Sequence, residues 1–310
     1  MKILALSGGI GGAKLALGLS HVLPAGALSV IANTGDDFTH LGLRISPDID
    51  TLCYTLGGLD NPVLGWGRAD ESWAFMETLG ALGGETWFRL GDRDLALHVW
   101  RTAQLAAGAT LSAVTASVAA RFGIASAILP MSDDPVATRV ATTEGTLDFQ
   151  EYFVHRQCRP VVRGLEFAGA AQARIAPGAQ AALAAPDLAA IVICPSNPFI
   201  SIDPILAVPG LRAALRAAPA PVIAVSPLIG GKAVKGPTAK MMQEMGMTVD
   251  AAAVAAHYGD LLDGFVLDSA DAATRIPGVA SIAAPTLMTG LAEKIALARA
   301  VLDFAAGLRA

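Results

Sequence analysis

Four aspartates stand close together directly after the second apparent strand of the chain, and a glycine-rich loop lies shortly before them. They are Asp36, Asp37, Asp48 and Asp50. A diphosphate repels free carboxylates unless a hard cation lies between them, and Mg²⁺ typically takes one or two carboxylates together with phosphate oxygens and water. The pattern therefore predicts a Mg²⁺ site that holds a phosphate-containing ligand.

The four aspartates differ in their position relative to a helix that the run S-P-D-I-D-T-L predicts. Side chains two residues apart on a helix do not share a face, so Asp48 and Asp50 are not expected to be equivalent ligands. We predict Asp36 and Asp50 as the metal ligands. Helix capping and local turn formation are the alternative roles, and we expect them for one or two of the four.

A cluster of glycines, G-G-I-G-G-A-K, follows the first predicted strand and opens a helix. Small residues there permit close approach of a phosphate, and the N-terminus of a helix favours an anion. The spacing fits neither a dinucleotide fingerprint, which needs a third glycine at Lys14, nor a P-loop, which needs Gly-Lys followed by Ser or Thr. A tight turn without a ligand is the alternative. The substrate-binding residues predicted here are Gly9, Gly11, Gly12 and Lys14.

Two later loops also follow predicted strands, whose carboxyl ends form the ligand-binding edge of open α/β sheets. The first, C-P-S-N-P-F, provides Ser196 and Asn197, with a Pro-bounded turn as the alternative. The second, S-P-L-I-G-G-K-A-V-K-G-P, offers backbone donors and positive charge suited to phosphates. The residues predicted in this second loop are Gly230, Gly231, Lys232 and Lys235.

The order of the predicted elements indicates an α/β fold. A strand, a glycine loop, a helix and a second strand open the chain as a β-α-β unit, which indicates a parallel sheet. Residues 70–122 contain three or four amphipathic helical patterns that we interpret as an inserted lobe. Residues 125–167 contain short strand patterns, some of which are expected to extend the sheet at an edge. The remainder returns to alternating strands and helices.

Composition argues against several classes of protein. The chain has 310 residues, of which 53% are hydrophobic, enough for a sizeable core. Its formal charge of -5 leaves no basic stripe for DNA or RNA. Three widely spaced cysteines indicate neither a disulfide framework nor a zinc site, which favours a reducing cytoplasm. No uninterrupted apolar run reaches ~18 residues, so no membrane segment is expected.

Seven motifs, in order along nearly the whole chain, resemble the 2-phospho-L-lactate transferase family. They are G-G-I-G-G-A-K, N-T-G-D-D, R-I-S-P-D-I-D-T, G-W-G-R-A-D-E-S-W, L-G-D-R-D-L, P-S-N-P and S-P-L-I-G-G-K-A-V-K-G-P. The resemblance implies a Rossmann-like, mostly parallel sheet with an inserted, largely helical lobe. Residues 1–65 and 125–310 would form the α/β domain that binds a guanosine diphosphate donor and the metal. Residues 66–124 would form the helical insertion that helps to bind a deazaflavin.

The activity that the resemblance implies is a transfer step in coenzyme F(420) biosynthesis. A phospho-carboxylate unit would pass from a guanosine diphospho-linked donor to the terminal hydroxyl of Fo, 7,8-didemethyl-8-hydroxy-5-deazariboflavin. GMP would be released, and Mg²⁺ would assist. Phospholactate, phosphoenolpyruvate and a phosphoglycerate-type unit differ by a few atoms, so the identity of the acid stays open. A homodimer is also expected, from the family and from the alanine-rich helices.

The resemblance also distributes roles among the residues. Asp36 and Asp50 match the family's metal-binding acidic motifs. One of the two other aspartates would orient or deprotonate the attacking hydroxyl, and lysines would hold the donor phosphates. The residues expected to act in catalysis are Asp37, Asp48 and Lys232, with Lys235 as a second phosphate ligand.

Further substrate contacts are expected on both sides of the site. Asn197 and the 230–235 loop would hold the guanosine donor, and Trp66, Trp73 and Arg93 are candidates for the deazaflavin. Simple core packing is the alternative for either tryptophan. Two more predicted substrate-binding residues end the second strand, Asn33 and Thr34.

Two rival functions come from other classes of protein. A relative with the same glycine-rich opening that binds a UDP-sugar and acts in regulation would lack transfer chemistry. The motifs N-T-G-D-D, R-I-S-P-D-I-D-T and G-D-R-D favour the transferase instead. An NAD-dependent dehydrogenase is suggested by the first β-α-β unit, but the missing third glycine and the Asn33-Thr34-Gly35 end of the second strand argue against it.

Overall fold

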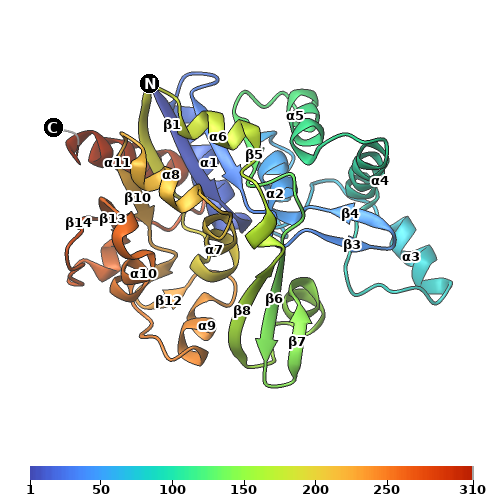
Figure 1. Ribbon diagram of the computed structural model, residues 1–310. Helices are drawn as coiled ribbons and strands as arrows, with labels where there is room; N and C mark the ends of the chain where they lie inside the picture. Colours follow the sequence, from blue (N-terminus) through green and yellow to red (C-terminus); the bar gives the residue numbers. More distant parts are fainter. Residues whose placement is uncertain (309–310) are drawn as a thin grey trace.

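The computed structural model describes residues 1–308, and a parallel seven-stranded sheet lies at the centre of this part of the chain (Figure 1). Its strands, in spatial order, are β14 (Ala280–Ala284), β13 (Gly264–Asp268), β10 (Val222–Val225), β9 (Leu188–Ile193), β1 (Lys2–Ser7), β2 (Leu28–Ala32) and β5 (Ala127–Pro130). The inner strands are short apolar runs buried on both faces, as parallel sheets require. The chain order reverses between β1 and β9, and open α/β sheets bind ligands beside such a reversal.

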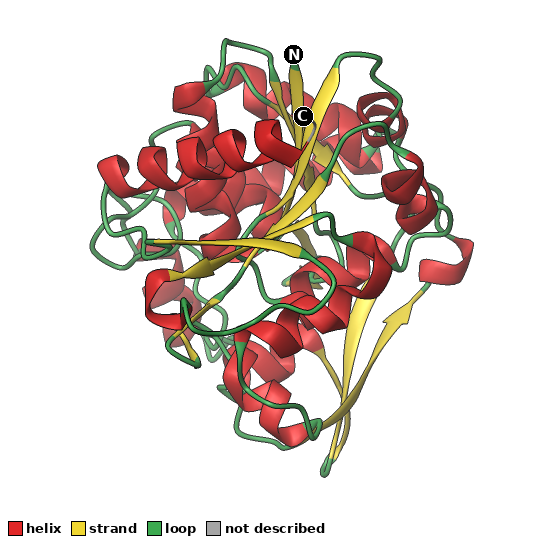
Figure 2. Cartoon of the chain, turned by 90° about the vertical axis from the view of Figure 1, so that its left-hand side faces the viewer, coloured by secondary structure: helices red, strands yellow, loops and turns green. Residues whose placement is uncertain are grey.

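Helices cover both faces of the sheet (Figure 2). One face packs against α1 (Gly9–Val22), α2 (Pro47–Leu56), α5 (Leu111–Arg121) and α11 (Leu291–Leu308). The other packs against α6 (Pro177–Leu183), α7 (Asp203–Leu206), α8 (Leu211–Ala217), α9 (Thr238–Glu244) and α10 (Ala251–Tyr258). The predicted fold class, a Rossmann-like parallel sheet in an α/β protein, is confirmed.

The segment predicted as an inserted lobe is helical. It contains α3 (Ala74–Ala81) and α4 (Asp92–Ala106), followed by α5. A small apolar cluster of Ile45, Met76 and Leu90 joins this lobe to the hairpin of β3 (Phe38–His40) and β4 (Leu43–Ile45). The lobe therefore packs on the acidic segment that the sequence singled out.

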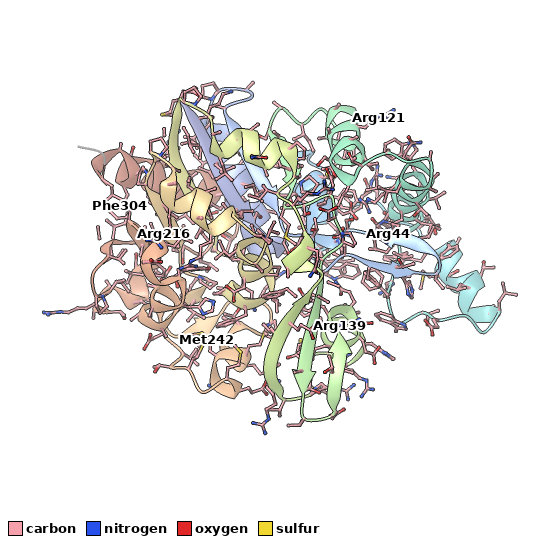
Figure 3. All side chains as sticks on the ribbon, in the orientation of Figure 1. Arg44, Arg121, Arg139, Arg216, Met242 and Phe304 are labelled. Carbon is pink, nitrogen blue, oxygen red and sulfur yellow. The ribbon has the colours of Figure 1, made fainter. Side chains whose placement is uncertain are left out.

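Residues 137–168 form a separate antiparallel sheet in the order β7-β6-β8, which projects from the body of the molecule in Figure 1. Its strands are β6 (Ala137–Thr142), β7 (Gly145–Asp148) and β8 (Val162–Ala168). Arg139 of β6 lies 3.7 Å from Asp148 of β7 on this sheet (Figure 3). Of the strands predicted in this region, only β5 extends the central sheet, where it pairs with β2 at the edge.

The remaining elements are short. They are the hairpin strands β11 (Leu228–Ile229) and β12 (Lys232–Ala233), π-helical turns at Glu151–His155 and Pro198–Ile202, and 3-10 turns at Ala170–Gln172, Gly259–Leu261 and Ser269–Asp271. Within residues 1–308, no single helix has the length and apolar character to cross a membrane. One pair bent by 84°, Pro198–Leu206 with Leu211–Ala217, meets the same test of length and composition.

Candidate functional site

A cavity of about 580 Å³ opens at the carboxyl ends of the central strands. Its lining includes the start of α1 after β1, the Pro195–Asn197 segment after β9, and Ser226 after β10. The cavity thus lies at the reversal of strand order between β1 and β9, where the fold predicts a ligand.

The glycine-rich turn forms one wall of this cavity. Gly9, which lines it, has a φ of +65°, a conformation that favours glycine. Gly11 also lines the cavity, and a Cβ there would overlap with the carbonyl oxygen of Pro195. Gly12 lies behind the lining, and a Cβ there would overlap with the hydroxyls of Ser7 and Ser196. Close packing of α1 on the strand ends therefore explains Gly12, whereas Gly9 is placed to meet a ligand.

Asp36 and Asp48 line the cavity and share one buried partner, Asn33. The Asn33 Nδ2 donates to Asp48 Oδ2 at 2.9 Å and lies 3.5 Å from Asp36 Oδ1, and the backbone N–H of Gly9 donates to Asp48 Oδ1. Burial raises the pKa of Asp48 to about 6, although both hydrogen bonds lower it. Burial, and next the charge of Asp48, raise the pKa of Asp36 well above its usual value. These carboxyls are crowded and short of positive charge.

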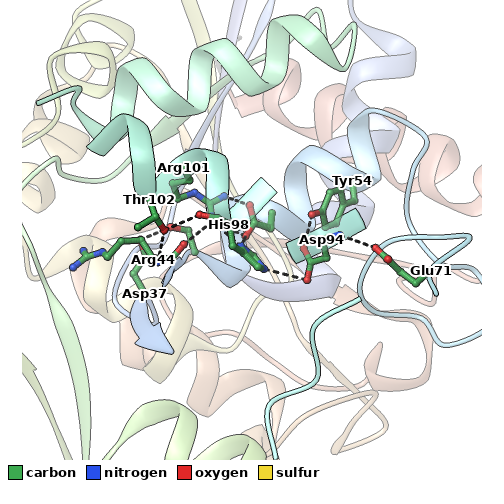
Figure 4. Close-up of polar contacts among 10 residues, drawn as sticks. Asp37, Arg44, Tyr54, Glu71, Asp94, His98, Arg101 and Thr102 are labelled. Atoms are coloured by element: carbon green, nitrogen blue, oxygen red, sulfur yellow. Dashed lines mark hydrogen bonds and ion pairs between the residues drawn. The ribbon is translucent and has the colours of Figure 1, made fainter. Parts of the chain in front are cut away.

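Asp50 of α2 has ionisable partners on α4, where His98 and Arg101 lie side by side (Figure 4). Arg101 of α4 is 1% exposed; its Nη1 donates to Asp50 Oδ2 at 3.0 Å and its Nη2 pairs with Asp50 Oδ1. His98 lies between Asp50 and Asp94, with Nδ1 at 3.7 Å from Asp50 Oδ2 and Nε2 at 3.1 Å from Asp94 Oδ2. The Tyr54 hydroxyl donates to Asp94 Oδ1. This buried network places one carboxylate from each helix at the cavity wall.

Two lysines supply positive charge to the cavity. Lys14 Nζ donates to the carbonyl oxygen of Met288 at 2.9 Å, and Lys235 Nζ lies 3.4 Å from the carbonyl oxygen of Gly65. Burial lowers the pKa of Lys14, followed by the nearby positive charges of Lys235 and Lys294. Both Lys14 and Lys235 line the cavity, so both are available to contact a polyanionic ligand.

The cavity lining is also rich in aromatic and apolar side chains. Trp66, Trp87, Phe88, Phe149 and Phe153 all line the cavity. Arg89 adds a further cation to the lining, and its guanidinium stacks over the ring of Trp73, which lies outside the lining, at 4.2 Å. A cavity whose lining combines cations, carboxylates and aromatic rings fits a ligand that joins phosphates to a flat ring system.

Comparison with known proteins identifies the family. The model of the family described as 2-phospho-L-lactate transferase CofD matches residues 3–278. This chain belongs to the CofD family. It is therefore a member of a transferase family, and the resemblance of the seven motifs to this family of coenzyme F(420) biosynthesis is confirmed at that level.

Individual relatives of this CofD-family chain are similar over their full length. It is 44% identical over 320 residues to a phosphoenolpyruvate transferase of Streptomyces griseus, covering 100% of both chains. It is 45% identical to a protein of the same name from Kitasatospora aureofaciens and 42% identical to one from Thermobifida fusca, covering 99% of each of them. A solved UPF0052-family structure from Bacillus halodurans shares the fold, with a TM-score of 0.61 at 14% identity over 97% of this chain.

The structure of the CofD-family chain brings about half of the predicted site residues to the cavity. Ser196 and Asn197 both reach the lining; Ser196 Oγ accepts from the Gly8 N–H at 3.2 Å, and Asn197 Oδ1 accepts from the Phe199 N–H at 2.9 Å. The predicted residues in the lining are Gly9, Gly11, Lys14, Asp36, Asp48, Asp50, Ser196, Asn197 and Lys235.

The other predicted residues lie elsewhere, for local reasons. Gly230 and Gly231, with φ of +56° and +69°, form the turn between β11 and β12, and the Gly230 N–H donates to Asp271 Oδ2 at 2.9 Å. Asp37 is half-buried and lies outside the cavity lining, where it accepts from the Ser46 hydroxyl at 2.7 Å, and desolvation of its carboxyl raises its pKa to about 8. The predicted residues outside the lining are Gly12, Asn33, Thr34, Asp37, Arg93, Gly230, Gly231 and Lys232.

Four residues of the buried network, Tyr54, Asp94, His98 and Arg101, were not predicted from the sequence. Asp94, His98 and Arg101 stand at i, i+4 and i+7 in D-L-A-L-H-V-W-R, so they share one face of α4. This helical spacing of three ionisable residues is the sequence pattern that could have predicted a polar cluster on one face of α4. Their partners Asp50 and Tyr54 come from α2, and the i, i+4 spacing of these two likewise places them on one face of their helix.

Proposed function

We propose that this CofD-family protein transfers a phosphoenolpyruvate unit from a guanosine diphospho-linked donor to the terminal hydroxyl of Fo and releases GMP. The observation that carries the proposal is the cavity itself, whose lining combines two lysines and the start of α1 with aromatic side chains. The choice of phosphoenolpyruvate over phospholactate or phosphoglycerate rests on the name shared by the full-length relatives. Donor and acceptor can then meet in one enclosed space.

The reaction needs one displacement at phosphorus. The hydroxyl oxygen of Fo forms a bond to the phosphorus that carries the enolpyruvate, the bond from that phosphorus to the bridging oxygen breaks, and GMP leaves with the electron pair. The hydroxyl proton passes to a base or to water. Such transfers depend on positioning and charge stabilisation more than on covalent catalysis, so no enzyme intermediate is needed.

The donor is assigned to the cationic end. Lys14 and Lys235 would contact its phosphates, and the N–H groups at the start of α1 would add backbone donors. Asp48 is the aspartate that we propose to orient or deprotonate the attacking hydroxyl, because it lines the cavity whereas Asp37 does not. The aromatic wall with Trp66 and Trp87 would take the deazaflavin ring.

The carboxylates at the donor end fit a divalent cation. Asp36 is 6% exposed, has one distant amide donor and carries a raised pKa, so its charge lacks compensation. We propose Asp36 and Asp50 as Mg²⁺ ligands; when bound, the ion would neutralise charge on the bridging phosphate oxygens. Asp50, Asp94 and His98 also offer ligand atoms within 4.8 Å of one another. Mg²⁺ prefers oxygen ligands, which favours the aspartate pair over this group.

The test is a reaction with Fo, Mg²⁺ and each of the three guanosine diphospho-acids, followed by chromatography and mass spectrometry. We expect Fo-dependent GMP release to be fastest with the phosphoenolpyruvate donor, and chelation of Mg²⁺ to stop it. Faster turnover of another donor would show that the transferred acid is the one carried by that donor and not phosphoenolpyruvate. Binding of a UDP-sugar without turnover of any donor would instead support the regulatory function considered from the sequence.

Assembly and location stay predictions. The homodimer expected from the sequence is measured by light scattering on the purified protein, and the cytoplasmic location by fractionation of the source cells. Exposed apolar side chains on the lobe, Leu82 and Val99, are 82% and 51% exposed and are available for such an interface.

A further inference from the structure

Arg101 ranks first by volume among the fully buried side chains of residues 1–308. Its guanidinium pairs with both carboxylate oxygens of Asp50. The ion pair connects α4 of the helical lobe with α2, which opens beside the cavity. Asp50 lines the cavity and Arg101 does not, so the arginine acts on this carboxylate from behind the wall.

The guanidinium is held from other sides as well. Its Nη1 donates to the carbonyl oxygen of Arg44 on β4 at 3.3 Å and lies 3.3 Å from His98 Nδ1. The next residue, Thr102, accepts from the Arg44 N–H at 2.8 Å and donates to the His98 carbonyl oxygen at 2.7 Å, as Figure 4 shows. Together these contacts fix the orientation of the Arg101 side chain relative to β4 and α2.

A buried ion pair is a poor way to join two helices if stability is its only purpose. Apolar residues of similar volume are often neutral or stabilising in its place, because both charges lose their hydration. The orientation of a planar guanidinium and a carboxylate, by contrast, is fixed closely by two parallel contacts. The arrangement therefore favours a role in holding Asp50 over a role in holding the fold.

We propose that Arg101 is a positioning residue that fixes the Asp50 carboxylate at the cavity wall, so that the phosphate end of the site is complete only with α4 docked on α2. The inference rests on the proposed function, in which Asp50 is a metal ligand. Simple electrostatics predicts the opposite effect on a cation: removal of a positive charge beside Asp50 would tighten cation binding. Weaker cation binding by an Arg101 variant would therefore indicate that the arginine positions Asp50, whereas tighter binding would indicate an effect of charge alone.

The experiment compares Arg101→Met and Arg101→Lys with the wild type. Mn²⁺ serves as the spectroscopic probe in an electron paramagnetic resonance titration, and steady-state kinetics use Fo with the guanosine diphospho-donor. Methionine lacks the charge, and lysine keeps the charge but lacks the planar fork. We expect both variants to bind Mn²⁺ about tenfold more weakly and to lose about tenfold or more in kcat, with a smaller change in the KM for Fo.

The matched control removes a contact between a histidine and an aspartate outside the cavity. His257 Nε2 lies 2.8 Å from Asp203 Oδ2, and neither residue lines the cavity, so Asp203→Asn is expected to lower Tm without changing Mn²⁺ affinity. Circular dichroism checks folding, and Arg101→Lys carries the test if Arg101→Met does not fold.

Several outcomes would overturn the proposal. Unchanged or tighter Mn²⁺ binding with unchanged kcat would show that the guanidinium does not position Asp50, and so would full rescue by lysine. A wild type that binds Mn²⁺ without turnover contradicts the proposed reaction alone, and the affinities of the Arg101 variants still decide this inference. A wild type that shows neither binding nor turnover overturns both.

Discussion

Lys235 Nζ lies 3.4 Å from the carbonyl oxygen of Gly65, so the loop after β12 meets the loop that leads into the helical lobe. Trp66 and Gly67, which follow Gly65, line the cavity together with Lys235. A cation from the α/β part of the chain thus lies beside the first aromatic residue of the lobe. This contact brings the proposed donor end and acceptor wall together at one point.

Replacement of Lys235 by methionine is expected to raise the KM for the guanosine donor. A charge-assisted hydrogen bond to phosphate contributes about 1.5–3 kcal/mol, so the loss is about tenfold or more. Tm should not change, because the side chain is exposed. Steady-state kinetics with varied donor make the measurement. Lys232→Met provides the comparison: this lysine is exposed and outside the cavity lining, so its KM should stay near the wild-type value. An equal loss there would support the role predicted from the sequence.

The loop that contains Lys232 and Lys235 also shows what the local sequence can predict and what it cannot. The run G-G-K-A-V-K-G-P predicts a phosphate loop by composition, but glycine pairs also form the tight turn of a hairpin, and Gly230 and Gly231 do so. The same residues are compatible with a phosphate-binding loop and with a hairpin turn. Which one forms depends on the pairing of β11 with β12 and on the distant Asp271, and neither is visible in the local pattern.

The fold was more predictable than the site, because its signals are local. Strand, glycine turn and helix follow one another at the start of the chain, and apolar periodicity marks the later elements. The pairing of Arg101 with Asp50 joins residues 51 positions apart in sequence, and only the docking of α4 on α2 brings them together. Asp37 and Asp48 illustrate the same limit, since both belong to the acidic segment but only Asp48, in the first turn of α2, lines the cavity.

Gly12→Ala tests whether this glycine serves packing. Its Cβ would overlap with the hydroxyls of Ser7 and Ser196 in the contact between α1 and the strand ends. We expect a loss of about 1–3 kcal/mol in the free energy of unfolding, the usual result of overpacking. Urea unfolding measures it. Gly307→Ala in α11 is the control, because its Cβ meets nothing within 4 Å and alanine favours a helix. Equal stability of Gly12→Ala and the wild type would contradict the packing role.

Asp268 at the end of β13 makes a stabilising contribution that depends on pH. Burial alone would raise its pKa, but hydrogen bonds from the N–H groups of Ala270 and Thr286 and from the Thr286 hydroxyl outweigh burial and lower it. The carboxylate therefore stabilises the fold above the unfolded pKa of about 3.9, and this contribution is lost as the pH falls through the lower folded value. We expect Asp268→Ala to lower Tm at pH 7 and to differ less from the wild type near pH 3. A constant difference in Tm across that range would contradict the assignment.

Asp36→Asn distinguishes the role of Asp36 in Mg²⁺ binding from its effect on the stability of the metal-free protein. The Asp36 carboxyl is buried beside Asp48 and lacks a cationic partner, whereas an asparagine of the same shape carries no charge to bury. The variant should therefore melt higher than the wild type without metal. A cation that binds only the folded state raises Tm, and the rise is larger for tighter binding, so the rise that Mg²⁺ causes in the wild type should disappear in a variant that has lost the ligand.

Thermal unfolding followed by circular dichroism, with Mg²⁺ and with a chelator, measures both effects of the Asp36 substitution. Asp148→Asn on β7 is the control, because its side chain is 83% exposed and its loss changes the net charge equally. That control should keep both the wild-type Tm and the response to Mg²⁺. If Asp36→Asn also keeps the Mg²⁺ response, Asp36 is not a ligand; if it melts lower without metal, its carboxylate supports the fold in a way that the crowding of Asp36 and Asp48 does not explain.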